Sequence, residues 1–119
     1  MALGEPISAE ARDAIEAQPL HVSAISALEI AMLSQRNRLM TDAPIKLWFA
    51  TLMRRLSARL VGLDTDSLIE SAQLPGDPPR DPFDRIVIAA AVGQRLRLVT
   101  RDRLILAYCQ RRGIPSLGC

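Results

Sequence analysis

Apolar residues recur along this chain at two spacings, one typical of helices and one typical of strands. Strand-like runs are predicted at residues 20–23, 59–63, 95–100 and 114–117. Helices are predicted at residues 9–16, 26–37, 44–56, 64–74, 82–93 and 102–112. This alternation of strands and helices indicates an α/β domain with a mainly parallel sheet.

Local signals mark several helix boundaries. Ser8 is suited to cap the first helix, and Gly113 is suited to end the last one. The segment 75–79 contains three prolines, which exclude a continued helix there. Asp81 then offers a cap, and Pro82 occupies the first position of a strongly apolar helix.

Size and composition indicate one compact domain over residues 1–119. A chain of 119 residues with 49% hydrophobic and 24% charged residues is typical of a globular protein. At this size a domain buries roughly 65% of its unfolded surface and needs no disulfide. Disorder is therefore excluded as the main state of the chain.

Cysteine usage and the amino terminus indicate a soluble protein of the cytoplasm. The two cysteines, Cys109 and Cys119, form neither a metal-ligand pattern nor a disulfide scaffold. The first residues lack the basic start and apolar core of a signal peptide, and the apolar runs are too short to span a bilayer. No membrane partner is expected.

The formal net charge is only +2, but arginines gather in two regions of the chain. Guanidinium groups can contact phosphate oxygens bidentately, which suits a nucleic-acid partner. For any one cluster taken alone, a solvated helix face is the favoured interpretation. The clustered residues are Arg54, Arg55, Arg59, Arg95, Arg97, Arg101, Arg103, Arg111 and Arg112.

Three acids lie at junctions between predicted elements. Glu29 lies near the start of one helix, Asp84 in the first turn of another, and Asp102 directly after the strand that ends at Thr100. Ligands of open parallel sheets collect outside the carboxyl ends of the strands. Mg²⁺ and Mn²⁺ prefer hard oxygen ligands, so the three acids predict a divalent-metal site suited to phosphodiester hydrolysis.

Each acid also has a structural alternative that the sequence leaves open. Glu29 follows Ser26 by three residues, as in a capping box. Asp81 can be only a helix cap, and Asp102 only an acid at a helix start. Arg85 can pair with Asp81 across one turn. The coincidence of three acids favours the metal site over these alternatives.

Other chemistries are disfavoured. His21 is the single histidine, and Cys109 has no histidine placed as its base. The six glycines are scattered, so no glycine-rich phosphate loop is present.

The motifs around these acids resemble those of the PIN-domain family, specifically its VapC-type toxins of toxin–antitoxin systems. The resemblance rests on Ser-Ala-Ile-Ser-Ala-Leu-Glu-Ile at residues 23–30, Arg-Asp-Pro-Phe-Asp-Arg at 80–85, and Leu-Val-Thr at 98–100 followed by Asp102. These motifs appear in the family's order and cover nearly the whole chain.

The resemblance implies a three-layer α/β/α fold and a Mg²⁺- or Mn²⁺-dependent endoribonuclease that cleaves single-stranded RNA. It also implies a homodimer silenced by a cognate antitoxin. By the same resemblance, Glu29, Asp84 and Asp102 are the catalytic metal ligands. Thr100 is a supporting polar residue, and Asp81 is a capping or supporting acid.

One departure from the family pattern concerns the amino terminus. Family members open with a strand that ends in Asp-Thr-His, and this chain starts after it. About four strands are therefore expected, with an incomplete site, weak activity and marginal stability. The alternative function is a catalytically impaired fragment that only binds an antitoxin or a second subunit.

Overall fold

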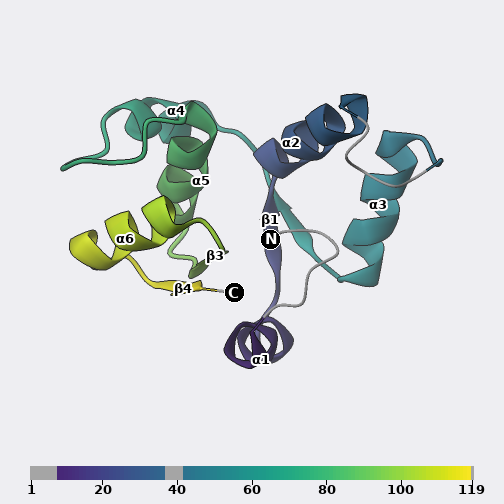
Figure 1. Ribbon diagram of the computed structural model, residues 1–119, viewed down its shortest axis with the longest axis horizontal. Helices are drawn as coiled ribbons and strands as arrows, with labels where there is room; N and C mark the ends of the chain where they lie inside the picture. The colour runs from purple at the N-terminus through teal and green to yellow at the C-terminus, as the bar shows by residue number, and fades with distance from the viewer. Residues whose placement is uncertain (1–7, 37–41, 119) are drawn as a thin grey trace. The chain divides into compact units, whose positions relative to one another are not determined.

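The computed structural model describes residues 8–36 and 42–118. Helices and strands alternate along them, as the sequence predicts (Figure 1). In chain order the elements are α1 (Ala9–Ala17), β1 (His21–Ser23), α2 (Ala24–Gln35), α3 (Ile45–Arg55), β2 (Arg59–Val61), α4 (Thr65–Ala72), α5 (Pro82–Gly93), β3 (Leu98–Thr100), α6 (Arg103–Arg112) and β4 (Ser116–Gly118).

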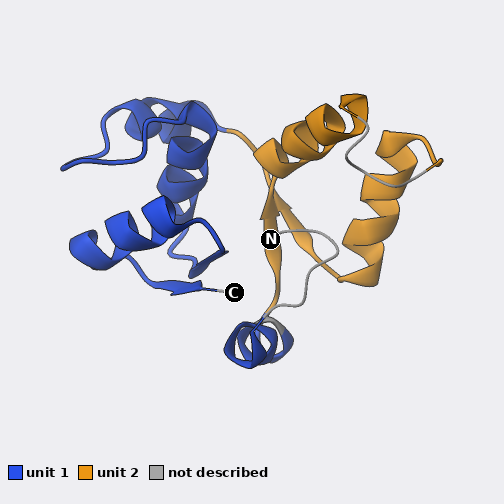
Figure 2. Cartoon of the chain, in the orientation of Figure 1, with its two compact units in different colours: residues 1–18, 64–119 blue, residues 19–63 orange. Residues whose placement is uncertain are grey.

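The chain divides into two compact units (Figure 2). Unit 1 comprises Met1–Gln18 and Asp64–Cys119, and unit 2 comprises Pro19–Leu63. Each unit contains one pair of parallel strands with its own helices. A single domain over residues 1–119 stays a prediction.

Unit 2 is built on the parallel pair β1 and β2, in which Val22 lies opposite Leu60. A parallel pair needs a crossover between its strands, and α2 and α3 provide it by packing against each other. Ile25, Ile30 and Val61 are the buried apolar residues of this unit in the described range.

Unit 1 pairs β3 with β4 in parallel, with Val99 opposite Leu117, and α6 provides the crossover. Its core contains Ile88 of α5 with Ile105, Tyr108 and Cys109 of α6. The fully buried Ile88 contributes about 1.5–3 kcal/mol relative to an exposed side chain. Ser8, the cap of α1, also belongs to this unit, since its hydroxyl donates to the carbonyl oxygen of Gly118 at 3.3 Å.

The predicted α/β class, the parallel pairing and the number of strands are confirmed within the described residues. These strands form two sheets of two strands each. Each strand pairs with its next neighbour in sequence inside its own unit, because the helices between the two strands return the chain to the same sheet. The strands are three residues long. Strands β2 and β3 are therefore shorter than the predicted ranges 59–63 and 95–100.

The predicted helix boundaries at Ser8 and Gly113 are confirmed. The backbone N–H of Ala11 donates to Ser8 Oγ at 3.1 Å, and Gly113 ends α6 with a left-handed φ of 69°. Arg95, two residues beyond the end of α5, also has a left-handed φ, of 56°. The expected helix end at Asn37 lies outside the described residues. None of the helices in the described ranges is long and apolar enough to cross a membrane.

Candidate functional site

Asp102 is the N-cap of α6, and one residue, Arg101, separates it from the end of β3. Its Oδ1 accepts hydrogen bonds from the backbone N–H groups of Leu104 at 2.8 Å and Ile105 at 3.1 Å. Its own N–H donates to Oγ1 of the buried Thr100 at 3.1 Å. The helix-start interpretation of Asp102 is therefore confirmed. Both capping bonds go to Oδ1, so Oδ2 takes no part in them.

Asp81 occupies the equivalent position at the start of α5. Its Oδ1 accepts from the backbone N–H of Phe83 at 2.8 Å, and Pro82 follows as the first helical residue. The expected capping role of Asp81 is confirmed. Asp84 lies three residues further on, in the first turn of α5, and is half-buried. Its carboxylate therefore has a different position from that of the cap.

Glu29 lies within α2, and the predicted capping box is wrong. Helix α2 begins at Ala24, and the N-cap is Ser23, whose Oγ accepts from the N–H of Ile25 at 3.2 Å. Ser23 has extended backbone angles because it also ends β1, so it forms the cap three residues before Ser26. Glu29 is consequently beyond the first helical turn, and its side chain is exposed. Capping does not explain this acid.

The proline-rich loop before α5 is held by side chains from two helices of unit 1. The Tyr108 hydroxyl donates to the carbonyl oxygen of Pro75 at 2.6 Å, and Nη2 of Arg111 donates to that of Asp77 at 3.1 Å. Nε of Arg85 donates to the carbonyl oxygen of Pro79 at 2.6 Å. Three alternate carbonyl groups of the loop are thus fixed. These tethers were not predicted from the sequence. The available signal was the run of prolines at 75–79, which lack backbone N–H groups and so cannot supply donors within the loop.

The three predicted acids are divided between the two units. Asp84 and Asp102 belong to unit 1, and Glu29 belongs to unit 2. Across residues 8–36 and 42–118, no three His, Cys, Asp or Glu side chains form a group that could hold a metal ion. Convergence of all three acids stays a prediction. The three carboxylates have the oxygen chemistry that Mg²⁺ and Mn²⁺ require.

Two side chains outside the predicted metal site, Asp64 and Cys109, have shifted pKa values. The Ser67 hydroxyl, which hydrogen-bonds Asp64, lowers the pKa of that carboxyl below its usual value. Burial raises the pKa of the Cys109 thiol. A raised pKa lowers the thiolate fraction near neutral pH and makes the thiol a poorer nucleophile.

The clustered arginines are not equivalent. Arg111 is committed to structure, since it donates to Asp77 and its guanidinium carbon lies 5.9 Å from the centre of the Tyr108 ring. Nη2 of Arg54 donates to Thr51 of the same helix at 3.2 Å. The other clustered arginines are exposed, except for the partly buried Arg101. Exposed guanidinium groups are available for phosphate contacts.

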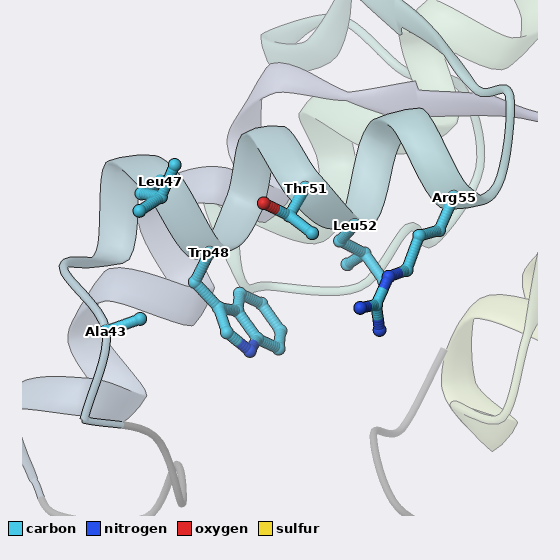
Figure 3. Close-up of a pocket in the computed structure, with 6 residues that line it drawn as sticks. All are labelled: Ala43, Leu47, Trp48, Thr51, Leu52 and Arg55. Atoms are coloured by element: carbon cyan, nitrogen blue, oxygen red, sulfur yellow. The ribbon is translucent and has the colours of Figure 1, made fainter.

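Unit 2 carries a hollow of about 340 Å³ along α3 (Figure 3). It is lined by Ala43, Leu47, Trp48, Thr51, Leu52 and Arg55. The Trp48 ring and the Arg55 guanidinium project to the same side of the helix (Figure 3). Among the described residues its lining is mainly apolar, with the cation of Arg55 at one end.

Comparison with known proteins agrees with the motifs described above. The PIN domain family model matches residues 1–110. The chain is also 34% identical over 109 residues to "Ribonuclease VapC22" of Mycobacterium tuberculosis (strain ATCC 25618 / H37Rv), an alignment that covers 91% of this chain and 82% of that protein. The family match spans both units and contains Glu29, Asp84 and Asp102. The chain therefore belongs to the PIN-domain family.

Proposed function

We propose that this protein is a VapC-type toxin, a metal-dependent endoribonuclease that cleaves single-stranded RNA by phosphodiester hydrolysis. The observation that carries the proposal is the family match, which includes all three predicted acids. The similarity to a protein named as a ribonuclease supports RNA as the substrate. Because the match extends across both units, we also propose that they form one domain.

In this proposal Glu29, Asp84 and Asp102 would hold Mg²⁺ or Mn²⁺. The bound ion would polarise the phosphodiester and lower the pKa of a bound water. Asp102 keeps its Oδ1 in the α6 cap, so its contribution to the ion would come through Oδ2. Thr100 orients Asp102 by accepting its backbone N–H, and exposed arginines bind the phosphates of the RNA.

We propose that the α3 hollow receives the cognate antitoxin, and that the toxin forms a homodimer. The hollow combines the apolar surface of Leu47 and Trp48 with the cation of Arg55, which suits an apolar segment carrying an acid. The second candidate function follows from the same surface. It is a catalytically impaired PIN protein that binds an antitoxin or subunit without cleaving RNA.

A matched pair of helix caps tests the nuclease. Asp81 and Asp102 each accept a backbone N–H two residues ahead at 2.8 Å, and asparagine caps a helix about as well as aspartate. Asp102→Asn should therefore keep the fold and lose Mn²⁺-dependent cleavage of a single-stranded RNA. Asp81→Asn, the control, should keep both. Asp84→Asn and Glu29→Gln should behave like Asp102→Asn.

The expected loss of rate is at least about 100-fold for each ligand variant, since misplacement of a reacting group by about 1 Å costs that much. Equal cleavage by Asp81→Asn and Asp102→Asn would refute the assigned ligands. Absence of cleavage by the wild-type chain, together with retained antitoxin binding, would favour the binding-module alternative.

A further inference from the structure

The first turn of α5 is attached to the loop that precedes it through Arg85. Arg85 directly follows Asp84 in sequence. Its Nε–H donates to the carbonyl oxygen of the buried Pro79 at 2.6 Å. The backbone N–H of Arg85 donates to the carbonyl oxygen of Asp81 at 3.2 Å. Because Asp81 is the N-cap of α5, this backbone bond belongs to the helix, and the Arg85 side chain alone joins the helix start to the loop.

The other end of this loop is attached to α6. Tyr108 and Arg111 hold the carbonyl groups of Pro75 and Asp77, and Tyr108 is fully buried in the core of unit 1. Asp102 caps the same helix α6. The loop thus connects the helix that begins at Asp102 to the helix that carries Asp84.

We propose that Arg85 is a positioning residue for Asp84, which it keeps in place for a divalent cation by fixing the first turn of α5 to the loop. The inference rests on the proposed function, because it assigns Asp84 as a ligand. Residues that orient metal ligands through hydrogen bonds typically change metal affinity about 10–100-fold when they are substituted.

The direction in which Mn²⁺ affinity changes on substitution of Arg85 separates a positioning role from a purely electrostatic one. A cationic side chain next to a metal ligand repels the incoming cation, so loss of the charge alone should tighten Mn²⁺ binding. Loss of the bond to Pro79 should instead weaken Mn²⁺ binding, because Asp84 is no longer held. The two explanations of any Arg85 variant therefore predict opposite changes.

The experiment measures Mn²⁺ affinity by the electron paramagnetic resonance signal of free Mn²⁺, together with kcat and KM on a single-stranded RNA. Arg85→Met removes the donor and the charge and keeps an apolar stem. Arg85→Lys keeps the charge and can restore one bond. Arg80→Met is the matched control, since Arg80 is an exposed arginine of the same segment.

We expect Arg85→Met to raise the Kd for Mn²⁺ about tenfold and to lower kcat, with little change in KM for the RNA. Arg85→Lys should recover part of the affinity, and Arg80→Met should keep the wild-type Kd. Unchanged or tighter Mn²⁺ binding by Arg85→Met would overturn the inference, as would an equal loss in Arg80→Met.

Two further measurements keep the inference testable. If Arg85→Met does not fold, Tyr108→Phe loosens the opposite end of the loop and should raise the Kd in the same direction by a smaller factor. An unchanged Kd in Tyr108→Phe would then overturn the inference. If the wild-type chain binds no Mn²⁺, the proposed function is overturned as well. If the wild-type chain binds Mn²⁺ and Arg85→Met binds it with the same Kd, only the positioning role is overturned.

Discussion

Replacement of Tyr108 by phenylalanine isolates one hydrogen bond between α6 and the proline-rich loop. The Tyr108 side chain is 1% exposed, and its hydroxyl donates to the carbonyl oxygen of Pro75 at 2.6 Å. Phenylalanine keeps the ring in the core and removes only the oxygen. Pro75 itself is exposed, so water can replace the lost donor. The cost should therefore be that of an ordinary neutral hydrogen bond, about 0.5–1.5 kcal/mol, without the larger penalty of a buried unpaired carbonyl.

This loss should be visible in urea unfolding followed by circular dichroism. A decrease of about 1 kcal/mol should lower the urea midpoint by roughly 0.5 M with an unchanged m-value. The melting temperature should fall by about 3–5 °C for a chain of this size. Leu104→Ala on the same helix is the control, because Leu104 is 69% exposed and its truncation should stay within about 0.5 kcal/mol.

Two results would refute this reasoning. Equal stability of Tyr108→Phe and wild type would show that the bond contributes nothing in solution. A loss above about 3 kcal/mol would show that the Pro75 carbonyl is left without water, or that the core repacks around the new ring.

Three further predictions concern stability. Arg95→Gly should raise the free energy of unfolding by about 0.5–1 kcal/mol in thermal melts, because Arg95 has a left-handed φ of 56° that favours glycine; a decrease would mean that its side chain makes a stabilising contact. The pKa of Asp64 is lowered, so its stabilisation should be present above its usual value near 3.8 and be lost as the pH falls through the lower folded value; acid unfolding of Ser67→Ala should show a smaller loss, because only the backbone N–H of Ser67 then remains as a donor from that residue. Trp48 reports on unit 2 and Tyr108 on unit 1, so coincident fluorescence and absorbance unfolding curves are expected if the two units are one domain, and separate midpoints would contradict that.

Signals that act within one helical turn were readable from the sequence. Ser8, Asp81 and Gly113 lie next to the groups they cap, so residue type and spacing are sufficient to place them. The wrong prediction of Ser26 as the cap of α2 also concerned residues within one helical turn of each other. Ser23 and Ser26 both offered a hydroxyl, and the extended conformation of the last strand residue decided in favour of Ser23.

Contacts between distant segments were not readable in this way. The bonds from Tyr108 and Arg111 to the loop join residues 33 and 34 positions apart, and no periodic pattern encodes such a pair. The candidate site likewise combines residues placed by local signals with a convergence that depends on long-range contacts. Local pattern placed Asp84 and Asp102 at helix starts. The predicted convergence of Glu29 with them depends on long-range packing of the chain, which no local pattern encodes.

The direct junction between β1 and α2 has a consequence for natural variation. Strand β1 ends at Ser23 and α2 begins at Ala24, with no connecting residue. An α-helix turns by about 100° per residue, so a single inserted amino acid here would rotate the whole of α2 relative to its strand. Glu29 would then face another direction. Insertions and deletions should therefore be excluded from this junction in active homologues, even where most substitutions on the exposed face of α2 are tolerated.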